Sequence, residues 1–510
     1  MTFLENLAAG FVAALQGWGI LVMVAGVAWG IIGGAIPGIS GAVAMALALP
    51  FTFALDPATA LVMLAGVWAG ANYGGSIPAI LMRMPGTPAA AACLLDGYAL
   101  ARQGYAAKAL GVSLICGTIG GLISVIVLIA LVVPLGDLLL HFGSPEIFAL
   151  ALFGLTLIAG LSGPSFLKGL ASGFFGLLLT AVGLDALTGS LRFTFGRAEL
   201  TAGIDIISVM VGLFAVSEMF HQIAHPAGRA VAVAGKTHTA FPTLAELRGV
   251  GRATFVGTVV GLIVGIMPGA GATASSFVAY NEARRWSKRP ELFGKGSMEG
   301  VAAPETANNA VQGGDLVPTL ALGIPGSNSA AIMLVALILH GIQPGPFLLA
   351  KHTHLVYTLF AGLILVNLLM VPVGIVILRL CLLAVKLAPP VLVASILALI
   401  AIGTYAGDLF ILNPLLALAF GVIGYAMNAF GFSAAATVLG LVLGDLAESE
   451  LRRSLILSYG SWTIFFTRPG SAVLLVLTLG VLLYPAALNA VRLWHSRGMA
   501  SRETAGSAAK

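Results

Sequence analysis

The stretch G-I-I-G-G-A-I-P-G-I-S-G, from Gly30 to Gly41, recurs as G-L-I-V-G-I-M-P-G-A-G-A from Gly261 to Ala272, with the two Pro-Gly pairs 231 positions apart. A further stretch, Y-G-G-S-I-P-A-I-L-M-R-M-P-G-T from Tyr73 to Thr87, recurs 240 positions later as G-G-D-L-V-P-T-L-A-L-G-I-P-G-S from Gly313 to Ser327. Two Pro-Gly breaks and an intervening proline therefore return in the same order. The chain contains an internal repeat whose apolar segments are interrupted by proline and glycine.

These segments belong to a strongly apolar chain. Of its 510 residues, 59% are hydrophobic and 9% are charged, whereas about a quarter of the residues of a soluble globular domain are charged. Residues 109–134, 354–378 and 471–493 form apolar stretches, and each reaches the roughly 20 residues that a helix needs to cross a bilayer. The sequence predicts an all-α polytopic membrane protein.

Two basic loops, 225–252 and 282–304, flank the apolar segment 253–281. The positive-inside rule places both loops in the cytoplasm, so the segment between them would enter the membrane and turn back at Pro268 and Gly269. A single kinked span with one basic loop outside is the alternative. The formal net charge of +5 arises largely in such loops, so it indicates topology and not a nucleic-acid partner.

The two copies are predicted to be inverted relative to each other. Four apolar spans, near 110–134, 145–162, 165–184 and 203–222, return the chain to the cytoplasm. The loop after the first Pro-Gly hairpin, 51–58, has no basic residue, whereas its counterpart is strongly basic. We expect two inverted repeats with re-entrant hairpins and broken helices, which place a substrate near the bilayer midplane.

We expect one transmembrane permease domain over residues 1–510, with about 10–12 membrane elements. The first repeat is expected at about 18–222, the second at about 250–446, and further spans near 354–378, 390–406, 412–428, 433–446 and 471–493, the last being C-terminal.

The four breaks are the candidate binding site. A helix that stops inside the membrane leaves free N-H groups at the start of its second half, and these suit a carboxylate. Freed carbonyls and nearby hydroxyls suit Na⁺, which prefers oxygen ligands. Helix kinks used only for packing are the alternative. The predicted substrate-binding residues are Gly38, Ser40, Gly86, Thr87, Gly269, Gly271, Thr273, Asn308, Asn309, Gly326, Ser327 and Asn328. The Na⁺ candidates among them are Ser40, Thr87, Thr273 and Ser327.

Asn308 and Asn309 belong to a polar run, 303–315, in which Glu305 and Gln312 lie at helical spacing from them. Such a face usually looks inward to a cavity or a partner helix. Glu305 is interpreted either as a solvated residue at the cytoplasmic border or as part of the site. Asp315 receives no role.

An enzyme is not expected. Gly38–Gly41 spells the G-x-S-G of rhomboid-type intramembrane proteases, but its repeat mate has no serine and no histidine lies within a span to act as the base. A channel is a weaker possibility, because paired re-entrant hairpins also build pores.

The chain resembles the large permease subunit, TctA, of the tripartite tricarboxylate transporters over nearly its whole length. The motifs that carry this resemblance are Pro37-Gly38, Tyr73-Gly74-Gly75-Ser76, Pro85-Gly86-Thr87-Pro88, Asp96-Gly97-Tyr98, Pro268-Gly269, Pro304-Glu305, Ala307-Asn308-Asn309-Ala310 and Leu322-Gly323-Ile324-Pro325-Gly326. Asp315 departs from the small residue expected there.

The resemblance implies uptake of a di- or tricarboxylate such as citrate, coupled to Na⁺ or H⁺, by a multi-pass protein of the bacterial inner membrane with an elevator motion. It also implies a small TctB-like membrane subunit and a TctC-like periplasmic solute-binding protein, with no cofactor beyond the coupling ion. A stand-alone carboxylate symporter or exporter is the alternative.

Overall fold

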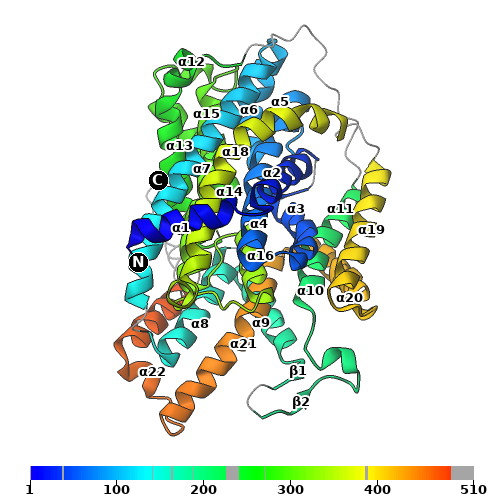
Figure 1. Cartoon of the computed structure of the whole chain (residues 1–510), viewed down its shortest axis with the longest axis vertical. Helices are drawn as coiled ribbons and strands as arrows, with labels where there is room; N and C mark the ends of the chain where they lie inside the picture. Colours follow the sequence, from blue (N-terminus) through cyan, green and yellow to red (C-terminus); the bar gives the residue numbers. More distant parts are fainter. Residues whose placement is uncertain are drawn as a thin grey trace, which may run out of the picture. The chain divides into compact units, whose positions relative to one another are not determined.

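The computed structural model describes residues 2–36, 39–139, 142–161, 165–185, 188–225, 241–269, 271–384 and 389–483. Within these ranges the regular structure is helical apart from one antiparallel pair of short strands, β1 (Gly183–Leu184) and β2 (Leu191–Arg192) (Figure 1). The predicted all-α class is confirmed.

The chain forms two compact units, Met1–His141 with Leu178–Phe430, and Phe142–Leu177 with Gly431–Lys510. Up to residue 141 the helices are α1 (Phe3–Leu15), α2 (Gly19–Ala35), α3 (Gly41–Ala48), η1 (Leu49–Ala54), α4 (Pro57–Gly74), α5 (Ser76–Met82), η2 (Pro88–Ala90), α6 (Ala91–Arg102) and α7 (Ala106–Leu139). From 142 to 250 they are α8 (Ser144–Leu161), α9 (Phe166–Thr180), η3 (Ala198–Leu200), α10 (Ile206–Val211), the π-helix η4 (Gly212–Val216), α11 (Ser217–Ala224) and α12 (Leu244–Gly249). The remainder are α13 (Gly251–Ile266), α14 (Gly271–Trp286), η5 (Pro290–Leu292), α15 (Glu299–Leu322), α16 (Asn328–Leu339), α17 (Leu348–Lys351), α18 (Thr353–Ala384), α19 (Pro389–Asp408), α20 (Leu412–Ala429), α21 (Ala434–Leu457) and α22 (Ile464–Thr467).

Four described helical segments are long and apolar enough to cross a membrane: Ala106–Leu135, Ile206–Ala224, Thr353–Leu378 and Leu412–Ala429. They match four of the predicted spans. The predicted spans near 145, 165 and 390 correspond to shorter apolar helices, and the predicted span at 433–446 is the first part of α21. α1 is not among the predicted spans; it is only 13 residues long and meets α2 at a bend of 76°. The number of membrane elements and the repeat boundaries stay predictions.

Each copy of the repeat contains the same glycine-lined helix contact. In the first copy α2 packs against α4, where a Cβ on each glycine would meet a backbone carbonyl oxygen: Gly26 and Met63 at 2.5 Å, Gly30 and Val67 at 2.2 Å, and Gly34 and Ala71 at 2.3 Å. In the second, α13 packs against α15 with the contacts Gly257 and Ala303 at 2.4 Å, Gly261 and Ala307 at 2.7 Å, and Gly265 and Val311 at 2.8 Å. Equivalent glycines of the two copies are 231 positions apart, and their partners are 240 positions apart. These are also the offsets of the first and the second Pro-Gly motif. Small residues at four-residue spacing let membrane helices approach closely.

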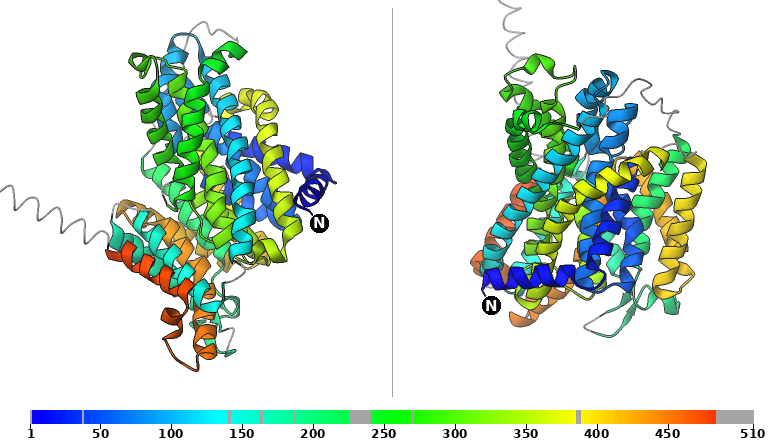
Figure 2. Two further views of the ribbon diagram at one scale, coloured as in Figure 1. Left: turned by 90° about the vertical axis from the view of Figure 1, so that its left-hand side faces the viewer. Right: turned by 45° about the horizontal axis from the view of Figure 1, so that its top comes forward.

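The chain turns back at Pro268, as the hairpin interpretation predicts. Gly257 in α13 lies against Ala303 of α15, and Ser276 in α14 donates to the carbonyl of Pro304, the next residue of α15, at 3.3 Å. The helices on either side of the break therefore reach the same level of α15, which excludes a single kinked span. Figure 2 shows α13 and α15 beside α7 from two further sides. The sidedness of the flanking loops stays a prediction.

The two copies meet where α4 crosses α15. Asn72 Nδ2 donates to the carbonyl of Asn308 at 3.1 Å, and Asn308 Nδ2 donates to the carbonyl of Asn72 at 3.2 Å. Gln312 Nε2 donates to the carbonyl of Ala65 at 3.1 Å. Because the contact moves back along α4 as it moves forward along α15, these helices run antiparallel. They are the equivalent helices of the two copies, so the copies are inverted relative to each other.

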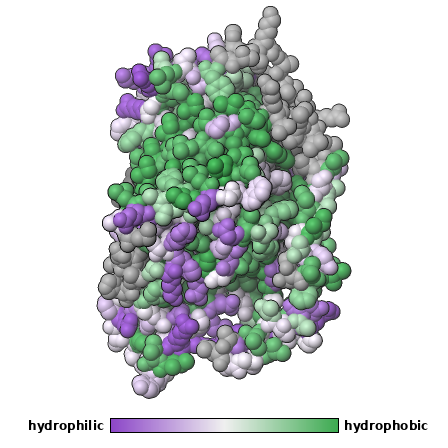
Figure 3. All heavy atoms as spheres, viewed as in Figure 1, coloured by the Kyte–Doolittle hydropathy of each residue, from purple (hydrophilic) through white to green (hydrophobic). Residues whose placement is uncertain are grey.

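Large apolar side chains point outward from the same helices that bury glycine. On α13, Phe255 and Ile263 are 68% and 58% exposed, while Gly257 and Gly261 face α15. Figure 3 shows apolar side chains gathered over α7, α13 and α18. Such a surface suits lipid, where packing between helices and not the burial of apolar side chains holds the bundle together.

The second unit uses the same close packing. α8 packs against α21 and α22, and a Cβ on Gly440 of α21 would lie 2.1 Å from the carbonyl oxygen of Gly173 in α9. Ser172 Oγ accepts a hydrogen bond from the backbone N-H of Ser433 at 3.0 Å. These contacts tie residues from two distant parts of the chain into one unit.

Candidate functional site

The second break of each copy has the same backbone geometry. Arg83 and Gly323, 240 positions apart, end α5 and α15 in the left-handed conformation, with φ of 58° and 72°. In both copies the next backbone N-H donates to a proline carbonyl six residues earlier: Met84 to Pro78 at 3.3 Å, and Ile324 to Pro318 at 3.2 Å. A left-handed residue with this bond is a common way to end a helix. The recurring proline before each Pro-Gly pair is thus part of the break.

The two breaks of each copy touch each other. A Cβ on Gly86 would lie 2.1 Å from the carbonyl oxygen of Gly34, and a Cβ on Gly326 would lie 3.0 Å from that of Gly265. These are equivalent positions. In the second copy the backbone N-H of Gly269 also donates to the carbonyl of Gly326 at 2.8 Å. A side chain would not fit at Gly86 or Gly326, which explains the glycine of the second Pro-Gly pair of each copy.

A third contact links the copies. Gly41 follows the first break and Ser329 follows the last break. A Cβ on Gly41 would lie 3.5 Å from Ser329 Oγ. α3 packs against α16, and in the equivalent arrangement α14 packs against η2. All four breaks thus lie in one chain of contacts. That they enclose one cavity stays a prediction.

The predicted hydroxyl residues have different environments. Ser40 and Ser327 cap α3 and α16, because their Oγ atoms accept from the backbone N-H groups of Val43 and Ala330 at 3.3 Å. Thr87 is buried and its Oγ1 has no hydrogen-bond partner among the described residues. Thr273 is exposed. The two serines therefore stabilise helix starts, whatever else they bind.

The remaining predicted residues near the breaks are glycines and one asparagine. Gly86 and Gly326 are buried, and Asn328 is exposed. Gly269 and Gly271 have φ of 86° and 68°, a conformation that glycine adopts without strain. Gly38 lies outside the described residues. The binding roles of all these residues stay predictions.

Asn308 and Asn309 face different helices, although they are neighbours in α15. Asn308 pairs with Asn72 of α4 as described. Asn309 Nδ2 donates to the carbonyl of Glu305 at 3.0 Å, and the position of a Cβ on Gly117 of α7 is 2.6 Å from the same nitrogen. Both side chains are 1% exposed, and neither Oδ1 atom has a hydrogen-bond partner among the described residues. They lie in two different helix contacts.

Glu305 is a buried residue and not a solvated one, since its exposure is 1%. Ser113 Oγ of α7 donates to its Oε2 at 2.9 Å, and the Ser76 hydroxyl and the Cys93 thiol lie close by. Its Oε1 has no partner within the described part of the chain. The alternative of a solvated border residue is therefore wrong.

Asp96, for which the sequence predicts no role, joins the two copies. Its Oδ1 accepts from the backbone N-H groups of Gly296 and Ser297 at 2.8 and 2.7 Å, and its Oδ2 accepts from the Tyr280 hydroxyl at 2.8 Å. Asp96 is 0% exposed. It anchors the loop before α15 to the first copy. The signal in the sequence was an acid in an otherwise apolar segment, ten residues after the Pro-Gly pair that ends at Gly86.

Asp315 is a second acid without an assigned role. It lies inside α15, is 0% exposed, and its carboxylate faces the break at Gly326. An acid inside a membrane-embedded segment is a functional candidate by default, so the run G-G-D-L-V-P contained the signal.

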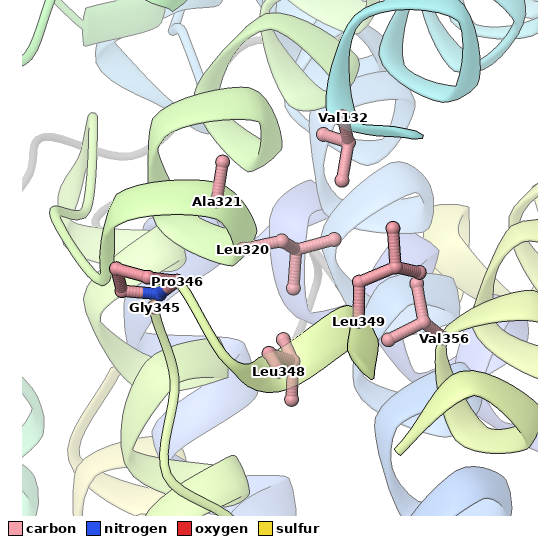
Figure 4. Close-up of a pocket in the computed structure, with 8 residues that line it drawn as sticks. All are labelled: Val132, Leu320, Ala321, Gly345, Pro346, Leu348, Leu349 and Val356. Carbon is pink, nitrogen blue, oxygen red and sulfur yellow. The ribbon is translucent and has the colours of Figure 1, made fainter. Parts of the chain in front are cut away.

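A small apolar cavity lies elsewhere in the unit (Figure 4). Side chains of α7, α15, α17 and α18 and of the loop before α17 line it, and its volume is about 10 Å³. One water molecule needs about 10–15 Å³. The cavity is too small for a di- or tricarboxylate and contains none of the predicted site residues.

Comparisons with known proteins show the family to which the chain belongs. Residues 20–439 match the family model described as "Tripartite tricarboxylate transporter TctA family". A protein of Agrobacterium vitis described as "Uncharacterized 52.8 kDa protein in TAR-I ttuC' 3'region" is 36% identical over 479 residues, which is 94% of this chain and 95% of that protein. Another from Agrobacterium vitis, "Uncharacterized protein in TAR-II ttuC' 3'region", is 36% identical over 214 residues, 42% of this chain and 88% of that protein. A comparison with solved structures gave no significant match. The chain is a multi-pass membrane protein and belongs to the TctA family of tripartite tricarboxylate transporter permeases.

Proposed function

We propose that this permease imports a di- or tricarboxylate across the bacterial inner membrane, driven by a Na⁺ or H⁺ gradient. It would act with a TctB-like small membrane subunit and a TctC-like periplasmic solute-binding protein. Membership of the TctA family supports the substrate class and the partners. The observation that carries the proposal is the chain of contacts between four helix breaks from two inverted copies.

The helix starts at these breaks are suited to an anion. α3 and α16 begin at Gly41 and Asn328, on either side of the contact between the copies. The N-terminus of a helix carries about half a positive charge and free N-H groups. Two such ends from opposite copies are expected to bind the two ends of a dicarboxylate.

Uptake by the reconstituted system is expected to need both a cation gradient and the binding protein. Proteoliposomes with the permease and its small subunit should accumulate labelled carboxylate only when the binding protein is added outside and a Na⁺ or pH gradient is imposed. Uptake should saturate with substrate, which a channel does not show. Equal uptake without the binding protein identifies a stand-alone symporter, and uptake indifferent to both gradients rejects cation coupling.

We infer that Arg83 contributes the positive side chain at the substrate entrance. It is exposed beside the second break, with its guanidinium carbon 5.8 Å from the ring centre of Tyr98. It keeps a left-handed conformation where the other copy has Gly323. A residue other than glycine in this conformation is strained, and such strain points to a function.

Arg83→Gly is expected to raise the KM for the carboxylate about tenfold, a loss of roughly 1.4 kcal/mol of binding. The melting temperature should not fall, because glycine adopts φ near 58° without steric cost. Arg83→Lys, which keeps the charge, is the matched control and should stay near the wild-type KM. An unchanged KM in the glycine variant removes Arg83 from the substrate path.

A further inference from the structure

Asp315 is a buried carboxylate without a counter-charge. It is 0% exposed, and neither of its oxygens has a hydrogen-bond partner among the described residues. None of the ion pairs between described residues includes it. Thr319 Oγ1 donates to the backbone carbonyl of Asp315 at 2.6 Å and so does not satisfy the carboxylate.

The surroundings of this carboxylate are other oxygen atoms. A Cβ added to Gly326 would lie 2.7 Å from Asp315 Oδ1 and 3.0 Å from the carbonyl oxygen of Gly265, so both oxygens lie close to the same place. The Ser327 hydroxyl lies close to the carboxylate, although the two groups do not meet the geometry of a hydrogen bond. Three kinds of oxygen therefore gather where the two breaks of the second copy meet.

The first copy has no such acid. Gly75 is the residue equivalent to Asp315, and Thr87 is the residue equivalent to Ser327. A Cβ on Gly75 would lie 2.4 Å from Thr87 Oγ1. The same local frame thus contains a carboxylate in one copy and a threonine hydroxyl in the other. Packing of the breaks alone does not need an acid, because the first copy achieves it without one.

An isolated buried carboxylate is too costly to persist as an anion and is found paired with a cation or protonated. The neighbouring carbonyl oxygen of Gly265 adds to the cost, because it presents negative partial charge to the carboxylate. A hard cation between these oxygens converts this repulsion into attraction, and hard cations take oxygen ligands.

We propose that Asp315 binds a sodium ion at the meeting point of the second copy's two breaks, with the Ser327 hydroxyl and the Gly265 carbonyl as further ligands. The proposal rests on the proposed cation coupling and assigns the coupling ion one site, in the second copy.

The test measures Na⁺ binding and not transport. The purified full-length permease is melted in detergent over a series of NaCl concentrations, with choline chloride keeping the ionic strength constant. Wild type is expected to gain a few degrees, since a ligand at 100 times its Kd stabilises by about 2.7 kcal/mol. In Asp315→Asn the gain should vanish or need at least tenfold more Na⁺. The same gain in Asp315→Asn, or none in wild type at pH 7 and pH 9, overturns the proposal.

Glu305→Gln is the matched control, because Glu305 is equally buried in the same helix but lies beside Ser113 of α7. It should keep the wild-type response to Na⁺. If it loses the response while Asp315→Asn keeps it, the ion binds elsewhere and the proposal is wrong. If Asp315→Asn does not fold, Ser327→Gly replaces it, since glycine is a tolerable helix cap, and an unchanged Na⁺ midpoint there overturns the proposal.

Failure of this site and failure of the proposed function give different results. Na⁺-driven uptake by wild type, together with unaltered Na⁺ binding in Asp315→Asn, rejects the site and leaves the function standing. Uptake indifferent to Na⁺ and pH gradients rejects the coupling, whatever the site binds.

Discussion

Replacing Gly30 by valine is expected to remove most of the folded protein from the membrane. A Cβ at this position would lie 2.2 Å from the carbonyl oxygen of Val67 and 2.8 Å from its carbonyl carbon. Both atoms belong to the backbone of α4 and cannot rotate away, so α2 and α4 must separate. Overpacking typically costs about 1–3 kcal/mol, and here the separation also disturbs the flanking contacts of Gly26 and Gly34. A large loss of the monodisperse peak in size-exclusion chromatography is the expected result.

The repeat supplies its own comparison. Gly261 is the equivalent residue, and its nearest contacts are looser, at 2.7 Å from the Ala307 carbonyl oxygen, so Gly261→Val should be damaging but less so. Gly251 has nothing within 4 Å of an added Cβ, and Gly251→Ala should leave the melting temperature unchanged or slightly higher. Equal melting temperatures for Gly30→Val and wild type contradict the close contact.

Asp96→Ala is expected to destabilise the permease by about 3 kcal/mol or more, because it leaves two buried donors and one half-buried donor unpaired at about 1–3 kcal/mol each. These donors are the backbone N-H groups of Gly296 and Ser297 and the Tyr280 hydroxyl. The carboxylate also lies near the start of α15, where a negative charge is favourable. Losing it frees the loop before α15, the helix that carries the buried acids Glu305 and Asp315. The measurement is the thermal melting of purified protein.

A graded series separates loss of bonds from loss of volume. Asp96→Asn keeps an acceptor for both backbone N-H groups and should be clearly milder than alanine. Tyr280→Phe removes one partner and should cost about 1 kcal/mol. If Asp96→Asn lowers the melting temperature as much as Asp96→Ala does, the negative charge, and not the hydrogen bonds, stabilises the loop before α15.

Much of the fold could be predicted because the repeat displays it twice. The offsets of 231 and 240 relate not only the Pro-Gly motifs but also the glycines and their partners, so the breaks and helix contacts follow one pattern. The turn at Pro268 followed from the basic loops on both sides. α1 was not predicted, because it is too short for a membrane span and its position depends on contact with α18.

The contacts of the site residues were harder to predict than the fold, because successive side chains of a helix point about 100° apart. Asn308 and Asn309 share a polar run, yet one faces α4 and the other α7. Thr273 lies near the tip of a hairpin but on its exposed side. The partners of Asp96 are 200 and 201 positions away, and no local pattern identifies them. Chemistry was readable from residue types, whereas orientation needed the tertiary structure.

The reciprocal bonds between Asn72 and Asn308 also say something about how the chain is made. The glycine contact of each copy joins helices close in sequence and can form early, whereas the Asn72 amide is 7% exposed in the finished protein and waits for a partner 236 residues downstream. At a synthesis rate of about 5–20 residues per second, that delay is roughly 10–50 s. In lipid an unpaired polar group costs several kcal/mol. Joining the halves is therefore a late step of biogenesis, and substitutions at Asn72 will act on that step and not on insertion of the first half.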